Sequence, residues 1–103
     1  MTMYNPDRWV VIKNPHCYKV FATWSGGYTH GSSWKLNSGI THCEQDGDYL
    51  VFHGYSGSTY RCHKSGYGIT GGWAGLIDIP GIEIVPPTTD FLNKDYQDVT
   101  TPH

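Results

Sequence analysis

Short segments rich in β-branched and aromatic residues recur along the first 63 residues, and several of them alternate apolar with polar side chains. A period of two is typical of β-strands with one buried face, and the glycine, proline, asparagine and aspartate residues between the segments form turns. Turn signals recur every eight to twelve residues, which is the spacing of a meander, barrel or sandwich. The pattern predicts six strands, over residues 8–13, 18–24, 34–39, 40–44, 49–53 and 58–63.

The strongest local signal is a hairpin over residues 49–63, and the rest of the chain is organised around it. The hairpin is entered through Asp46-Gly47, a dipeptide that favours tight turns, and its two strands are joined by a glycine turn at residues 54–57. Residues 25–33 differ, since they contain three glycines and lie between two tryptophans. We expect a loop there.

The strand pattern weakens in the last third of the chain. Residues 81–85 are a plausible last strand, and Pro86-Pro87 ends it. We therefore expect a single β-rich domain over residues 1–85 and an acidic, proline-led C-terminal tail over residues 86–103. Because that tail has few apolar anchors, we expect it to lie on its own body or on a neighbouring copy.

Composition supports a mostly β fold. The chain of 103 residues has only two alanines, four leucines and two glutamates, whereas it has eight tyrosines, four tryptophans and 13 glycines. Helix formers are scarce, and strand and turn formers are plentiful. We expect a small antiparallel meander, barrel or sandwich of about six to seven short strands with an irregular C-terminal tail.

The charge distribution argues against nucleic-acid and membrane partners. The formal net charge is −2, with six Lys/Arg against four Asp/Glu in residues 1–64 and one against five in residues 65–103. Neither part has the strong positive field that sequence-independent nucleic-acid binding needs. There is also no basic amphipathic stretch suited to a membrane surface and no apolar run as long as a membrane span.

Two further features bear on the compartment. The N-terminus lacks the apolar region of a secretion signal. An odd number of cysteines without paired spacing agrees with a reducing environment. We therefore expect a soluble protein of the cytoplasm with three free thiols, at Cys17, Cys43 and Cys62.

The six histidines and three cysteines raise the question of a metal site. Cys62 and His63 are adjacent, so they point to opposite faces of a strand and do not readily chelate one ion. A three-histidine site is the alternative, with His53 and His63 facing one another across the hairpin and His42 joining them. We expect ordinary surface or hydrogen-bonded histidines instead, with no metal ligand and no cofactor.

The residue types of a hydrolase are present without its motifs. Tyr55-Ser-Gly-Ser-Thr59 does not complete the Gly-x-Ser-x-Gly of a nucleophile elbow, and Gly54-x-x-Gly57 is not followed by the Gly-Lys-Ser/Thr of a phosphate loop. Nothing marks the Cys62 thiolate as stabilised. The residues whose types would suit a nucleophile, a base and an acid are Ser38, Ser56, Ser58, His53, His63 and Asp48. We assign no catalytic residue and expect a protein that is not an enzyme.

Aromatic and small hydroxyl residues occur together in the loops, a composition typical of recognition surfaces. Aromatic faces stack on bases and sugars, hydroxyls bind phosphates, and glycine lets a ligand approach the backbone. Four large side chains are expected to fill the core instead, namely Trp9, Trp24, Trp34 and Phe52. The candidate ligand-binding residues are Tyr28, Trp34, Asn37, Ser38, Tyr55, Ser56, Ser58, Arg61, His63 and Lys64.

Three motifs resemble a group of small uncharacterised proteins of tailed bacteriophages. They are Trp34-x-Leu-Asn-Ser-Gly-Ile40, Asp46-Gly-Asp-Tyr49 and Phe52-x-Gly-x-Ser-Gly-Ser-x-Tyr-x-Cys-His-Lys-x-x-Tyr-Gly68. The resemblance covers about residues 8–68, and the chain beyond Gly75 departs from it. It implies a phage origin and action in the bacterial cytoplasm, and it implies no activity.

These observations support three functional interpretations. The leading one is a β-rich binding protein, acting as a homo-oligomer, that counteracts host defence by sequestering a small nucleotide-type immune signal or by binding a host protein. In that interpretation Arg61 and Lys64 supply the charge for a phosphate. The second is a nucleic-acid-binding β-barrel that stacks bases on Trp34, Tyr55 and Tyr60. The third is a small hydrolase or metal-dependent enzyme.

Overall fold

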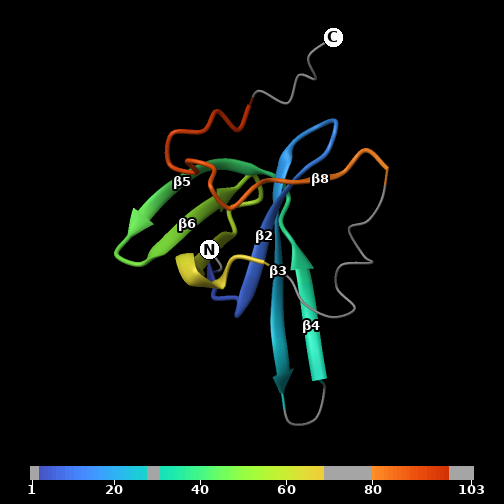
Figure 1. The fold of residues 1–103 in the computed structure, drawn as a ribbon, viewed down its shortest axis with the longest axis vertical. Coiled ribbons are helices and arrows are strands. Elements are labelled where there is room, and N and C mark those ends of the chain that lie inside the picture. The colour runs from blue at the N-terminus through green and yellow to red at the C-terminus, as the bar shows by residue number, and fades with distance from the viewer. Residues whose placement is uncertain (1–2, 28–30, 69–79, 98–103) are drawn as a thin grey trace.

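The computed structural model describes residues 3–27, 31–68 and 80–97, which form two four-stranded β-sheets (Figure 1). The strand order is β1-β7-β6-β5 in the first sheet and β4-β3-β2-β8 in the second. β1 runs parallel to β7, and the other neighbouring strands are antiparallel. The strands are β1 (Met3–Tyr4), β2 (Arg8–Lys13), β3 (Tyr18–Gly27), β4 (Gly31–Leu36), β5 (Ile40–Asp46), β6 (Tyr49–Gly54), β7 (Thr59–His63) and β8 (Glu83–Ile84), and a 3₁₀ turn, η1 (Lys64–Gly66), follows β7. The predicted mostly β fold is confirmed.

One hydrophobic core joins the two sheets. Trp9 and Val11 of β2 pack in the same cluster as Phe52 of β6 and Tyr60 of β7, and all four are at most 1% exposed. The opposite face of the second sheet carries a smaller buried cluster, formed by Val10, Ile12 and Phe21. β2 is therefore buried on both faces, which explains why its sequence is a continuous apolar run with no alternation.

The predicted strands match the observed ones best around the central hairpin. β2 has the predicted bounds, and β6 and β7 differ from the prediction by one residue each. The predicted loop over residues 25–33 is wrong at residues 25–27 and 31–33, because β3 continues to Gly27, which pairs with Gly31 at the start of β4. The register shifts between Trp24 and Gly27, and glycine tolerates such an irregularity well. Residues 28–30 lie outside the described residues.

The large aromatic side chains divide between the core and the surface. Trp9 and Phe52 are buried as predicted, and Trp24 is partly buried against the core. Trp34 is 49% exposed, so its assignment to the core is wrong. It lies on the edge strand β4 and stacks on Phe21 at a ring-centroid distance of 5.5 Å, on the face of the second sheet that points away from the first.

In the described residues 85–97 the C-terminal segment forms no strand after β8, yet it takes part in the core. Val85, Phe91 and Tyr96 are at most 7% exposed and belong to the same cluster as Trp9 and Phe52. Figure 1 shows this orange-to-red segment continuing from β8 back over the strands. Residues 86–97 therefore lie on the body of their own domain, one of the two arrangements expected for the tail.

Candidate functional site

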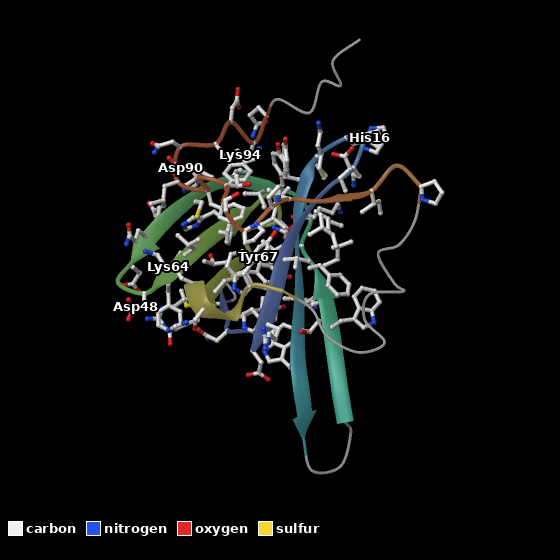
Figure 2. All side chains as sticks on the ribbon, viewed as in Figure 1. His16, Asp48, Lys64, Tyr67, Asp90 and Lys94 are labelled. Carbon is white, nitrogen blue, oxygen red and sulfur yellow. The ribbon has the colours of Figure 1, made fainter. Side chains whose placement is uncertain are left out.

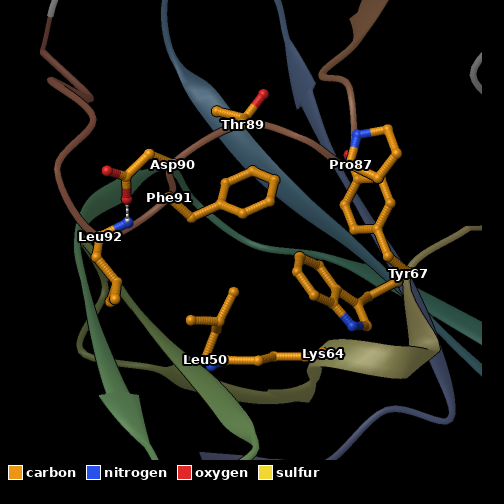
Figure 3. Close-up of a pocket in the computed structure, with 9 residues that line it drawn as sticks. Leu50, Lys64, Tyr67, Pro87, Thr89, Asp90, Phe91 and Leu92 are labelled. Carbon is orange, nitrogen blue, oxygen red and sulfur yellow. Dashed lines mark hydrogen bonds between the residues drawn. The ribbon is translucent and has the colours of Figure 1, made fainter.

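A pocket of about 270 Å³ lies between the C-terminal segment and the strands beneath it (Figure 3). β2 and β6 supply its floor, and residues 64–67 close one side. Residues 87–92 form the opposite wall. The lining residues are Trp9, Leu50, Lys64, Tyr67, Pro87, Thr89, Asp90, Phe91 and Leu92.

Three aromatic rings form the apolar part of the pocket. Trp9 and Tyr67 meet edge to face with ring centroids 4.7 Å apart, and Phe91 lies 5.8 Å from Trp9 and 5.7 Å from Tyr67. Offset and edge-to-face contacts at these distances stabilise the rings relative to one another. The rings therefore form a stiff apolar surface that is built before any ligand arrives.

The polar atoms of these rings are already hydrogen-bonded inside the protein. The indole Nε1 of Trp9 donates to the backbone oxygen of His63 at 2.8 Å. The Tyr67 hydroxyl accepts from the backbone nitrogen of Val11 at 3.2 Å and donates to the backbone oxygen of Val85. Burial raises the pKa of Tyr67, so the phenol stays neutral and keeps this donor. These bonds hold the rings in position and leave their faces for contact with a ligand.

Two charged residues lie on opposite sides of the pocket, Lys64 on the floor side and Asp90 on the wall side (Figures 2 and 3). The Asp90 carboxylate accepts bonds from the backbone nitrogens of Leu92 and Asn93, at 3.2 and 3.3 Å, and from the Asn93 side chain at 2.7 Å. The side-chain bond from Asn93 is the main cause that lowers the pKa of Asp90. This carboxylate is therefore occupied in shaping the turn.

Lys64 differs from Asp90 because its ammonium group forms no ion pair within the described residues. Its backbone nitrogen donates to the backbone oxygen of Asp48 at 2.9 Å, which fixes the start of η1. Its side chain is exposed and forms no ion pair with any residue in the described ranges 3–27, 31–68 and 80–97. Lys64 is thus a cation available to a ligand beside an aromatic surface.

Comparison with protein-family models, with curated proteins and with solved structures found no match to this chain. Within the described part of the chain, no helix is long and apolar enough to cross a membrane.

Of the nine candidate ligand-binding residues that the structure describes, only Lys64 lines this pocket. Arg61 lies on the outer face of the first sheet, where its guanidinium is 3.6 Å from the Tyr49 ring centroid and its Nε donates to Asp46 at 3.2 Å. His63 also contacts Tyr49, and its Nδ1 accepts from the backbone nitrogen of Ser65 at the start of η1. These two residues are engaged in contacts within the protein.

A second group of candidate ligand-binding residues does come together, where the connection from β4 to β5 meets the turn between β6 and β7. The Ser38 hydroxyl donates to that of Ser56 at 3.2 Å and accepts from the backbone nitrogen of Ser56 at 3.0 Å. The Tyr55 hydroxyl donates to Gln97 at 2.9 Å, and the buried Asn37 accepts from the backbone nitrogen of Val20 at 2.9 Å. These bonds tie two loops and the C-terminal segment together.

The remaining candidates lie apart from both groups. Ser58 is partly buried beside the β6–β7 turn, where its backbone oxygen accepts from Gly54. Trp34 lies on the outer face of the second sheet. Tyr60 is 1% exposed, so it cannot serve as a stacking platform for bases. Tyr28 lies outside the described residues.

The strand register changes the metal hypothesis. His53 pairs with Thr59 on β7, and His63 pairs with Tyr49, so the prediction that His53 and His63 face one another is wrong. Tyr49, the partner of His63, lies four residues before His53 on β6, and four residues of a strand span roughly 13 Å. His53 instead pairs with His42 of β5, and Glu44 takes the third position, with all three ligand atoms within 4.8 Å of one another.

The residue types of a hydrolase are dispersed. Ser38 and Ser56 bond to one another, while His53 bonds to Glu44. Cys62 is fully buried, and burial raises its pKa well above the usual value, so its thiol does not ionise at neutral pH. None of these groups forms a nucleophile with an adjacent base.

Sequence reasoning did not find the pocket because its three rings come from distant parts of the chain. Trp9 is expected as a core residue, and Phe91 lies in the tail, for which the sequence predicts few apolar anchors. Tyr67 stood in a Ser-Gly-Tyr loop that the sequence marks as a recognition segment. No signal in the sequence links these three residues, since their contact depends on how the tail folds back.

Proposed function

We propose that this protein is a non-enzymatic binding protein for a small planar anion of nucleotide type, held in the pocket beneath the C-terminal segment. The observation that carries this proposal is the pairing of a rigid aromatic surface, formed by Trp9, Tyr67 and Phe91, with the exposed Lys64, which forms no ion pair within the described part of the chain. Ligand pockets commonly combine apolar rings with a few polar groups that orient the ligand. The rings would contact a base, and Lys64 would contact a phosphate.

The pocket volume restricts the size of the ligand. At about 270 Å³, the pocket is at the small end of the range of roughly 300 to 1,000 Å³ that is usual for ligand sites. A single base with a short phosphorylated substituent suits this volume, and one base of a larger cyclic nucleotide could enter with the remainder exposed. The pocket volume therefore favours a ligand, or a part of a larger ligand, of mononucleotide size.

Binding is favoured over the alternatives by particular residues. A nucleic-acid-binding barrel needs several exposed rings along a basic groove, whereas Tyr60 is buried and Trp34 lies away from the pocket. An enzyme needs polar groups that are available for proton transfer, whereas Tyr67 and Asp90 are engaged in bonds within the protein. Sequestering a ligand needs only an aromatic surface and a cation, and the pocket has both.

The sequence resemblance suggests where this binding would act. Similarity to small phage proteins implies the cytoplasm of an infected bacterium. There, a small protein that captures a nucleotide-type immune signal would counteract host defence without any turnover. A host protein as the target, and a homo-oligomer as the active form, stay predictions of the sequence.

Calorimetric titration with a panel of mononucleotides, cyclic dinucleotides and ADP-ribose derivatives tests the proposal. We expect at least one compound to bind saturably and Lys64→Ala to weaken it by about 10-fold to 100-fold, the loss typical of one charge-assisted bond. Leu92→Asp should weaken binding as well, because Leu92 is 39% exposed at the pocket and a carboxylate there repels an anion.

Lys19→Ala is the matched control, since it removes the same charge from β3, which does not line the pocket. It should leave the affinity unchanged. The absence of heat for every compound would overturn the proposal, and so would equal losses for Lys64→Ala and Lys19→Ala. Equal losses would mean that the protein attracts anions only through its overall charge.

A further inference from the structure

Three metal-ligating side chains converge on the outer face of the first sheet. His42 and Glu44 project from β5, and His53 projects from β6 directly opposite His42. The two imidazole rings stack at 4.2 Å with an angle of 8° between their planes, and the Nε2 of His53 lies 3.0 Å from a carboxylate oxygen of Glu44. All three ligand atoms lie within 4.8 Å of one another.

The strand geometry explains why these side chains share one face. Residues two apart on a strand point the same way, and cross-strand partners lie side by side. Cys43, between His42 and Glu44, is buried in the core, so its two neighbours must face outward. The register irregularity between Ile40 and His42 places the extra residue, Thr41, next to the pair.

Thr41 orients the first imidazole. Its hydroxyl donates its one proton to the backbone oxygen of His53 at 3.1 Å, so it can only accept from the Nδ1 of His42, which lies 3.1 Å away. His42 therefore carries its proton on Nδ1 and leaves the Nε2 lone pair free. Metal-binding histidines are commonly held this way by a hydrogen bond to the other ring nitrogen.

We propose that His42, Glu44 and His53 form a binding site for one divalent transition-metal cation of the zinc type. Two imidazoles and one carboxylate suit Zn²⁺, Cu²⁺ and Ni²⁺, whereas Mg²⁺ and Ca²⁺ prefer oxygen ligands alone. In a tetrahedral zinc site the ligand atoms lie about 3.3 Å apart. The 3.0 Å separation of His53 from Glu44 already matches, and small side-chain rotations would bring His42 into place.

The site would remain open to solvent on one side. The side chain of Glu44 is 64% exposed and that of His53 is 31% exposed. Three protein ligands leave a coordination position for water or for an anion. Arg61 does not oppose the cation directly, since it is held against Tyr49 and Asp46 on the same face. The metal would take the place of the hydrogen bond between His53 and Glu44.

Zinc titration of the full, untagged chain tests this inference. We expect saturable binding of one Zn²⁺ per chain, weaker by at least 100-fold for His42→Ala and for His53→Ala and by at least 10-fold for Glu44→Gln. Mg²⁺ should not compete. Zn²⁺ should also raise the melting temperature of the native protein, because it links two strands, and that rise should vanish in the histidine variants.

His16→Ala is the matched control, since His16 is an exposed histidine at the tip of the β2–β3 hairpin, outside the cluster (Figure 2). It should bind Zn²⁺ like the native chain. For the positioning residue, Thr41→Val should weaken binding about 10-fold and Thr41→Ser should restore it, because only the hydroxyl matters. Unchanged binding in the two histidine variants, or no saturable binding by the native chain, would overturn the proposal.

Discussion

At the scale of single residues, burial governs the chemistry of two thiols and of two phenols. Cys43 and Tyr60 are buried, and the loss of hydration raises the pKa of each to about 12. The pKa of Cys62 and that of Tyr96 are raised as well, for the same main reason. These groups stay protonated at neutral pH, so they act as packing residues and not as nucleophiles.

The raised pKa values predict that the protein loses stability in alkali. In the unfolded chain Cys43 and Tyr60 would ionise near their ordinary pKa values of 9.0 and 10.0, whereas in the folded chain they hold their protons to about pH 12. Their stabilising effect is therefore complete below about pH 9 and falls as the pH rises from 9 to 12, by up to about 1.4 kcal/mol per pH unit for each group.

Urea unfolding measured between pH 7 and pH 11 checks this. The midpoint should stay level up to about pH 9 and then fall, and absorbance should show that tyrosine ionisation accompanies unfolding. A midpoint that stays level up to pH 11 would contradict the burial of these groups.

At the scale of elements, the connection from β4 to β5 carries the chain from one sheet to the other. Asn37 keeps the pairing with β3 after β4 ends, since its backbone nitrogen donates to Val20 and its side chain accepts from the same residue. Gly39 then turns the chain with a φ of 138°, beneath the ring of Tyr55. The two sheets therefore depend on a short segment with little freedom.

Gly39→Ala should destabilise the fold by about 2 to 4 kcal/mol. A Cβ atom there would lie 2.7 Å from the Tyr55 ring, and an L-residue is strained at that φ. Gly57→Ala is the control, because Gly57 also has a positive φ, 89°, but a Cβ there meets no atom within 4 Å. We expect it to cost about 1 to 2 kcal/mol. Urea unfolding of both variants measures the difference, and equal losses would mean that Tyr55 moves aside freely.

The elements themselves could be predicted from the sequence where the local pattern determines them. The hairpin of β6 and β7 follows from alternation and its glycine turn, and β2 follows from a β-branched run between turn residues. β1 has only two residues and exists because it pairs with β7. The extension of β3 through its glycines likewise depends on its partner β4. Partner-dependent pairing leaves no local signal.

The site was less predictable than the strands for the same reason. Loop composition indicates Ser38, Tyr55 and Ser56 as candidates, but Ser38 and Ser56 bond to one another and the Tyr55 hydroxyl bonds to Gln97. Lys64 was recognised by its charge. The aromatic wall opposite it depends on Phe91, and composition alone does not show that a polar, acidic segment returns to the core.

At the scale of the whole molecule, the C-terminal segment links stability to the proposed binding. The ring centroid of Phe91 lies 5.8 Å from that of Phe52 and 5.8 Å from that of Trp9. Phe91 therefore both covers the core and lines the pocket. Tyr96 donates its hydroxyl proton to the backbone oxygen of Phe91 at 2.6 Å and contacts Tyr18. Removing the segment would expose the core and remove one wall of the pocket.

Phe91→Ala should therefore lower the free energy of unfolding by about 3 to 5 kcal/mol, the usual cost of truncating a buried phenylalanine. Since small domains are stable by only about 5 to 15 kcal/mol, this loss would be a large part of the total. Leu92→Ala is the neighbouring control, because Leu92 is 39% exposed and should cost about 1 kcal/mol or less. Urea unfolding of both variants gives the comparison. If Phe91→Ala were as mild as Leu92→Ala, the segment would be an attached tail and not a part of the core, and the pocket would lack the fixed wall that binding a planar ligand requires.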